Sequence, residues 1–282
     1  MKTNYFPLKT FAAIIAFTTV ITSCNRHKEK DKDIDTQAAS DFEQGQFVGE
    51  DVSNMADAAA DGIGKFRLAP GVSDDVMSGC ATITLDTLNS TDADTITIDF
   101  GTSNCLCIDN RYRRGILTII RFGNRFTAGS YRTVTFNNYF VNDHQVEGTH
   151  TITNNGQNST GNWNWTVTAQ NMKITKPNGK WHSWNSTRNR EMIAGSATPL
   201  LKTDDVFIIT GIADGTNLNG NSYAASITSP LKREGSCHWI VQGTVLLTPS
   251  NKPQRVLDYG NGSCDDQATV AINGNTYNIT LH

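Results

Sequence analysis

Residues 131–153 read YRTVTFNNYFVNDHQVEGTHTIT, and this stretch decides the fold class. On both sides of Asn142-Asp143, apolar or aromatic residues alternate with threonine and other polar residues. Alternation with a period of two is typical of strands that have one buried and one solvated face. Asn and Asp accept the positive φ that a tight hairpin turn requires. The stretch therefore predicts two antiparallel strands joined by a short turn.

The same pattern recurs along most of the chain after about residue 79. Because strands that follow each other in sequence can pair directly, no crossover helices are required. The sequence predicts a mainly β fold, a long-stranded antiparallel hairpin meander that forms a curved sheet or a sandwich-like body. The further alternating segments are ATITL, TITIDF, NWNWTVT, VFIITG and ATVAI, and the further turn segments are KPNGKW, LNGNSY and INGNTY.

One short N-terminal helix is expected at Glu50–Gly62, which reads EDVSNMADAAADG. Asp51 or Ser53 can cap it, alanines fill its interior, and Gly62 ends it. A one-layer sheet would expose its apolar side, so some cover is needed. We expect the helix to lie against the apolar face of the sheet.

Two octets of the sequence are nearly identical, IDFGTSNC at residues 98–105 and LDYGNGSC at residues 257–264. Each ends in a cysteine that follows another cysteine by 25 or 27 residues. This spacing indicates one cysteine-hairpin unit used twice, at residues 80–105 and 237–264. A coincidence remains the alternative interpretation of so short a repeat.

The repeat predicts two disulfide bonds, Cys80–Cys105 and Cys237–Cys264. Cys107 has no counterpart in the second octet and is left over. The alternative is that Cys107, rather than Cys105, bonds Cys80. Several cysteines in one chain are consistent with an oxidising compartment.

The N-terminal segment has the pattern of an export signal. Lys2 and Lys9 precede the apolar run FAAIIAFTTVI, which is too short to span a membrane as a helix. Residues Ile21-Thr22-Ser23-Cys24 resemble a bacterial lipoprotein lipobox, and the charged stretch NRHKEKDKDID follows. The resemblance implies cleavage before Cys24 and acylation of that cysteine. The alternative is a plain secreted protein in which Cys24 is incidental.

The expected domain organisation has four parts. The formal net charge is −3, and the sequence shows no basic face, so it does not predict a nucleic-acid partner. The parts are residues 1–23, a lipoprotein signal peptide; 24–40, the lipidated cysteine and a charged tether; 41–79, a helical segment; and 80–282, the β domain.

Residues that could carry catalysis or bind a metal show no specific pattern. No nucleophile elbow, zinc motif or phosphate-binding loop is present in the sequence. His144 and His150 are interpreted as polar-face residues rather than ligands. Acidic pairs leave a calcium site as an alternative, although none matches a calcium loop. We expect neither a metal nor a cofactor, and the sequence favours a non-enzymatic protein over an enzyme.

Four tryptophans form the remaining candidate site, Trp163, Trp165, Trp181 and Trp184. Trp163 and Trp165 alternate with asparagines, so both indoles project from one face of a strand. Several indoles on one face could stack on a sugar or line a lipid groove. The interpretation that we favour is that they belong to the core.

The whole chain resembles the small envelope lipoproteins of Bacteroidota. The resemblance rests on the lipobox, the tether, the short helix, and the stretches YFVNDHQVEGTHTITN and LDYGNGSCDDQATVAINGNTYNITL. It implies attachment to the bacterial cell envelope, at the outer rather than the inner membrane, through lipid on Cys24. No functional residue is carried over from it.

The expected function is that of a non-enzymatic binding or structural protein at the cell surface or the periplasmic face. Its partner would be a glycan or an envelope protein. The alternative is a carbohydrate-binding or carbohydrate-active extracellular protein that uses an aromatic sheet face. In an enzyme of that class, Asp99 and Asp258 would be the candidate carboxylates, because retaining glycosidases need two of them close together.

Overall fold

The computed structural model describes residues 1–3, 32–62, 79–86, 93–199 and 201–282. Residues Asp33–His282 form one compact unit. Most of the expected signal peptide, and Cys24 itself, lie outside the described residues. Within the described ranges, no helix is both long and apolar enough to cross a bilayer.

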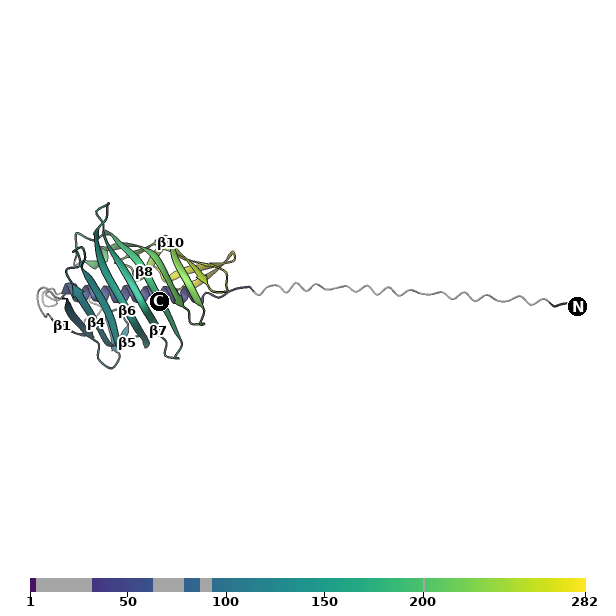
Figure 1. Ribbon diagram of the computed structural model, residues 1–282, viewed down its shortest axis with the longest axis horizontal. Helices are drawn as coiled ribbons and strands as arrows, with labels where there is room; N and C mark the ends of the chain where they lie inside the picture. The colour runs from purple at the N-terminus through teal and green to yellow at the C-terminus, as the bar shows by residue number, and fades with distance from the viewer. Residues whose placement is uncertain (4–31, 63–78, 87–92, 200) are drawn as a thin grey trace. The chain divides into compact units, whose positions relative to one another are not determined.

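The body is a single antiparallel sheet of fourteen strands (Figure 1), which confirms the predicted mainly β fold. Each strand pairs with the next along the chain, except that β2 pairs with β4 rather than with the short β3, which pairs only with β4. The sheet is not closed into a barrel. The strands are β1 Thr82–Asp86, β2 Asp94–Asp99, β3 Cys105–Leu106, β4 Tyr112–Phe122, β5 Tyr131–Val141, β6 His144–Gln157, β7 Trp163–Thr175, β8 Trp181–Ala194, β9 Val206–Thr216, β10 Ser222–Glu234, β11 Ile240–Pro249, β12 Arg255–Asn261, β13 Gln267–Ile272 and β14 Asn275–Thr280.

The predicted turn segments join consecutive strands. Asn142 and Asp143 have φ values of 47° and 61°, and Val141 pairs with His144 across them. Asn273 and Gly274, with φ values of 49° and 77°, join β13 to β14 in the same way. Two consecutive positive φ values define the hairpin turn whose twist matches that of paired strands. The local chemistry of these turns thus sets the register of the meander.

A single helix, α1 (Gln37–Gly62), lies along the sheet with the strands running across it (Figure 1). It begins thirteen residues before the expected Glu50, after Asp35, whose carboxylate accepts the Gln37 amide at 2.9 Å. At 1.5 Å per residue its 26 residues span about 39 Å. No described side chain of the helix is exposed, so α1 forms the interior of the body.

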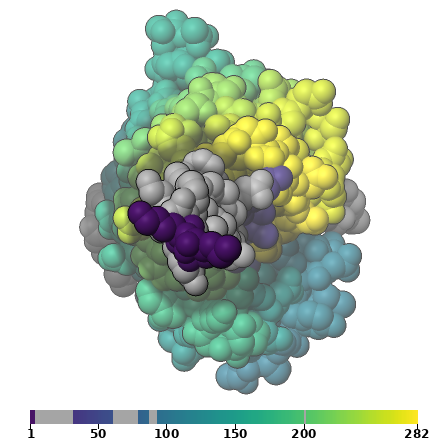
Figure 2. Space-filling model, turned by 90° about the vertical axis from the view of Figure 1, so that its right-hand side faces the viewer, coloured from purple at the N-terminus to yellow at the C-terminus, as the bar shows by residue number. Residues whose placement is uncertain are grey.

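The core has two parts that follow the two halves of the helix. The first half contributes Phe42 and neighbouring alanines to a cluster with residues of β9–β14, such as Leu247 and Val270. The second half contributes Val52 and Met55 to a cluster with residues of β2–β9. The end-on view in Figure 2 shows C-terminal residues (yellow) beside the residues that lead into α1. One helix therefore ties both ends of the sheet together.

Close approach of helix and sheet depends on a glycine. A Cβ on Gly45 would lie 3.1 Å from the Trp184 ring, and this indole is 6% exposed. That distance is shorter than nearly all contacts of real Cβ atoms. A glycine at this position thus lets the indole pack directly on the helix backbone.

Two disulfide bonds are present, Cys80–Cys105 and Cys237–Cys264, the pairs that the doubled octet predicts. Cys107 is free and buried, 2% exposed, so the alternative bond to Cys80 is not observed. The sulfhydryl lies 3.9 Å from the Cys105 carbonyl oxygen.

Removing the second disulfide is expected to destabilise the fold. With its cysteines 27 positions apart in the sequence, the loop-entropy relation gives a loss of about 3.5 kcal/mol in the free energy of unfolding for the Cys237→Ala, Cys264→Ala variant. Denaturant unfolding measures it, with Cys107→Ala as a single-cysteine control. Non-reducing peptide mapping checks the pairing, and a Cys105–Cys264 link would show that the repeat was misread.

Candidate functional site

The inner face of the sheet carries buried charge, which corrects the expectation of a dry apolar face. Acidic residues of α1 meet inward-pointing arginines of the strands, so the helix is held by ion pairs as well as by apolar packing. The sequence signal is arginine at every second position, as in Arg111-Tyr112-Arg113 and Arg188-Asn189-Arg190, which places both side chains on one face. Seven of the described arginines are buried, each 8% exposed or less: Arg111, Arg113, Arg125, Arg132, Arg188, Arg190 and Arg255.

His150 points inward and was wrongly expected on the polar face. It is 2% exposed, and its Nε2 lies 2.9 Å from Ser53 Oγ on the helix. Burial lowers its pKa to about 4. His182 is fully buried against Gln44 of the helix, at 3.0 Å, and burial lowers its pKa to about 3.

Acid is therefore expected to destabilise the protein well above the range in which carboxylates titrate. The unfolded state takes up a proton on His150 below about pH 6.5, whereas the folded state does so only near pH 4. Stability from this group is complete above pH 6.5 and is lost as the pH falls towards 4. His150→Gln should flatten the decline of Tm over this window, and His144→Gln, at the half-buried first position of β6, should leave it unchanged. Equal profiles for all three proteins would contradict the assignment.

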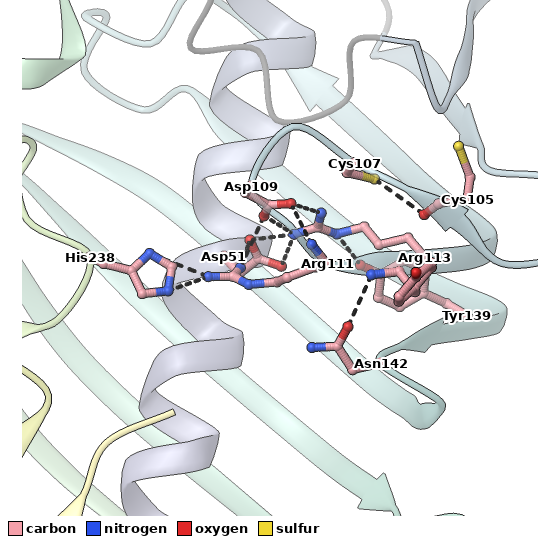
Figure 3. A network of polar contacts seen from close by, with 10 residues as sticks. Asp51, Cys105, Cys107, Asp109, Arg111, Arg113, Tyr139, Asn142 and His238 are labelled. Atoms are coloured by element: carbon pink, nitrogen blue, oxygen red, sulfur yellow. Dashed lines mark hydrogen bonds and ion pairs between the residues drawn. The ribbon is translucent and has the colours of Figure 1, made fainter.

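A network of polar contacts joins the middle of α1 to the start of β4 (Figure 3). Arg113 is fully buried, and its Nη2 donates to both Asp51 oxygens at 3.0 Å and to Asp109 Oδ2 at 2.7 Å. Its Nε donates to the Tyr139 hydroxyl at 3.2 Å. The two carboxylates raise the pKa of Arg113 although burial opposes them. The guanidinium is thus a permanently charged bridge between helix and sheet.

Arg111 extends this network towards the other side of the sheet. It donates to Asp51 Oδ1 at 2.7 Å and lies 4.3 Å from the Phe47 ring centroid. Its Nη2 donates to His238 Nε2 at 2.6 Å, from the loop between β10 and β11. Because arginine only donates, His238 accepts here as a neutral imidazole. Desolvation and the nearby Arg111 lower the pKa of His238, which favours that neutral form.

The contact between Arg111 and His238 marks a seam where two distant parts of the sheet meet over the helix. Beside it lies a cavity of about 460 Å³, called the seam cavity below. Its walls come from α1, from the segment before β4, and from the segments that begin β9 and end β10. The charged lining residues are Asp51, Asp57, Asp109, Arg111, Arg125, Arg190, Lys202, Asp205 and Arg233.

A second group of ion pairs lies on the other side of the seam cavity. Asp57 of α1 is within 3.4 Å of both Arg125 and Arg132. These arginines lower the pKa of Asp57 to about 2, despite its burial. Asp205 lies 3.6 Å from Arg125, and burial raises its pKa. The acids of the cavity wall are therefore largely engaged by Arg111, Arg113, Arg125 and Arg132.

The four tryptophans do not form one platform. Trp165 and Trp184 are buried, at 3% and 6% exposure, and Trp163 is half-buried against the core. Phe126 meets both Trp163 and Trp165 edge-on, with ring centroids 5.6 and 6.0 Å apart. Only Trp181, at the start of β8, is exposed, at 46%. The interpretation that the tryptophans belong to the core therefore holds for Trp163, Trp165 and Trp184.

The candidate glycosidase carboxylates have local roles. Asp99 accepts the Gly101 amide at 2.7 Å, and Asp258 accepts the Gly260 amide at 2.9 Å. Eight strands separate β2, which carries Asp99, from β12, which carries Asp258. In the described ranges, no group of three or more His, Cys, Asp or Glu side chains could hold a metal ion.

Comparison with known proteins does not assign a function to these residues. No protein-family model, no curated protein and no solved structure matches the chain.

Proposed function

We propose that the protein is an envelope-anchored binding protein and that the seam cavity is its binding site. One observation carries this proposal: a solvent-open cavity of about 460 Å³ lies among ionisable side chains. Small-molecule sites are concave and typically of about 300–1,000 Å³. Among the described residues, this cavity opens to solvent beside α1, so it gives a small molecule a way to the inner face of the sheet.

The lining of the seam cavity is held in place before any ligand arrives. Asp51 accepts hydrogen bonds from Arg111 and from Arg113, which lies behind the lining, and Arg111 is also fixed by Phe47 and His238. Side chains that are ordered in advance lower the entropic cost of binding. This arrangement supports selective binding of a small solute.

A variant that blocks the cavity tests the proposal. Ser236 is exposed and lines the cavity, so Ser236→Trp should fill the mouth and leave the fold intact. Wild-type protein purified from its native envelope should retain a small molecule in native mass spectrometry, and the variant should lose it. The matched control is Ser229→Trp, at a site in β10 that does not line the cavity. The same molecule retained by Ser236→Trp would contradict the proposal.

Anchoring through Cys24 is a separate prediction. The motivation is the apolar run that ends at Cys24 and the charged stretch behind it. Mass spectrometry of the N-terminal peptide should show a diacyl or triacyl mass on Cys24. Cys24→Ala should release a folded protein from the membrane fraction. An unmodified thiol in the wild-type protein would contradict the anchor.

A second candidate function is carbohydrate binding on the outer face of β7–β9. The observation that favours it is an open groove with Trp181 beside polar groups, namely Asn171, Lys173, Asn185 and Asp214. Lys173 Nζ lies 5.9 Å from the Trp181 ring centroid. An exposed indole flanked by amides and a carboxylate suits stacking on a sugar ring with hydrogen bonds to its hydroxyls. Trp181→Ala should abolish binding on a glycan array and leave Tm unchanged, and Ile212→Ala, another exposed apolar residue, is the control.

A further inference from the structure

Two inward-pointing arginines share one carboxylate at the edge of the seam cavity, and a third arginine lies close to them. Arg190 Nη2 lies 3.6 Å from Glu50 Oε2, and Arg233 Nε lies 3.4 Å from the same oxygen. Arg188 precedes Arg190 by two residues on the same face of β8, and it forms no ion pair with a described residue. Desolvation by burial lowers the pKa of Arg188 to about 10. Among the described residues, three arginines thus stand against one carboxylate at this edge.

Several donors of these arginines have no acceptor among the described side chains and backbone. Arg190 is 4% exposed and lines the cavity, and its buried Nε donates to no atom. Arg188 is 6% exposed, and its Nε and Nη1 likewise donate to none. A buried donor without a partner costs roughly 1–3 kcal/mol, and more when it is charged. An acceptor in the seam cavity would remove that cost at Arg190, whereas Arg188 does not line the cavity.

The charged side chains around the cavity also favour an anionic ligand. Among the described residues, five cationic and four carboxylate side chains line it, and Arg113, Arg132, Arg188 and Glu50 lie outside the lining but close to it. The four lining carboxylates face Arg111, Arg113, Arg125 and Arg132, as described above. A chain with a formal net charge of −3 thus concentrates positive charge at Arg190 and Arg233. Such a concentration attracts anions.

We propose that the seam cavity binds a small molecule through a doubly charged oxyanion group held by Arg190 and Arg233. Arg188 contributes further positive charge from outside the cavity lining. Phosphate, sulfate and vicinal dicarboxylates share this chemistry, and planar guanidinium groups match their oxygens in pairs. The volume of about 460 Å³ leaves room for an organic body beside the anionic group. The inference rests on the proposed function, because it names the ligand class of the same cavity.

Calorimetric titration with inorganic phosphate, sulfate and succinate, in chloride-free buffer, tests the inference. Wild-type protein should bind at least one of them, and Arg233→Gln should bind it at least tenfold more weakly. Arg233→Lys keeps the charge but loses the paired donors, so it should fall between the two. The matched control is Arg114→Gln, whose ion pair with Asp143 lies outside the cavity lining and whose affinity should equal that of the wild type.

Two results would overturn the inference: no binding of any of the three anions by the wild type, or equal affinity in Arg233→Gln. If Arg233→Gln does not fold, Ser236→Trp is titrated with the same anions in its place. Unchanged anion affinity in Ser236→Trp would also overturn the inference. Dimethyl sulfone, an uncharged molecule shaped like sulfate, separates the two proposals by NMR. Shifts at cavity residues with this probe but with no anion would overturn the ligand class and support the binding site. No shifts at cavity residues with any probe would overturn both.

Discussion

Trp165→Ala is expected to lower the free energy of unfolding by about 3–5 kcal/mol, as truncation of a large core aromatic does. The indole is 3% exposed and meets Phe126 and Phe207 edge-on, with the Phe207 centroid 6.3 Å away. The Arg125 guanidinium lies 5.7 Å from the Trp165 ring centroid, so truncation of the indole also removes a contact of this cavity-lining arginine. Urea unfolding followed by circular dichroism measures the change.

The matched control is Trp181→Ala, because this indole is 46% exposed and contributes little burial. Its free energy of unfolding should stay close to that of the wild type. A stable Trp163→Ala, Trp165→Ala double variant that has lost binding to a glycan or lipid would overturn the core interpretation. It would move the function to those two residues.

Asp51→Asn should cost about as much, roughly 3–5 kcal/mol, which is the usual effect of removing one partner from a buried ion pair. The Asp51 carboxylate is 10% exposed and faces two guanidinium groups, those of Arg111 and Arg113. Without its charge, Asp109 alone would balance both arginines. The variant keeps the shape of the side chain, so the loss reports charge rather than packing.

Asp143→Asn is the control for this variant, since it removes the partner of an arginine at the surface. Its partner Arg114 is 23% exposed and stands in solvent that can hydrate it. Exposed ion pairs contribute little to stability, so Tm should not change measurably. Equal losses in Asp51→Asn and Asp143→Asn would show that the network in Figure 3 does not stabilise the fold.

The strand and turn architecture could be predicted from the sequence because it is encoded locally. The alternation around Asn142-Asp143 and the turn at Asn273-Gly274 need only a few neighbouring residues to act. The disulfide pairs also followed from a local repeat. These features depend on sequence distances of at most about 27 residues.

The interior could not be predicted in the same way, because each buried charge is acceptable only with a distant partner. Asp51 meets Arg113 across 62 residues, and His150 meets Ser53 across 97. The expected helix covered only Glu50–Gly62, whereas the first half of α1, from Gln37, is rich in polar residues and is packed inside the body as well. The Arg-x-Arg spacing at the start of β4 (Arg111 and Arg113) and within β8 (Arg188 and Arg190) was the available sign of a charged inner face.

The position of α1 in the chain has a consequence for the order of folding. Its first residues leave the ribosome early, yet Phe42 packs against the last strands, and the Asp33 carbonyl accepts the Tyr277 hydroxyl across 244 residues. A core built from contacts so distant in sequence has a high contact order and forms slowly. Before β14 is made, the helix has no complete surface to cover and the sheet has no complete core. The chain must therefore remain unfolded, and protected from aggregation, until almost all of it has been synthesised.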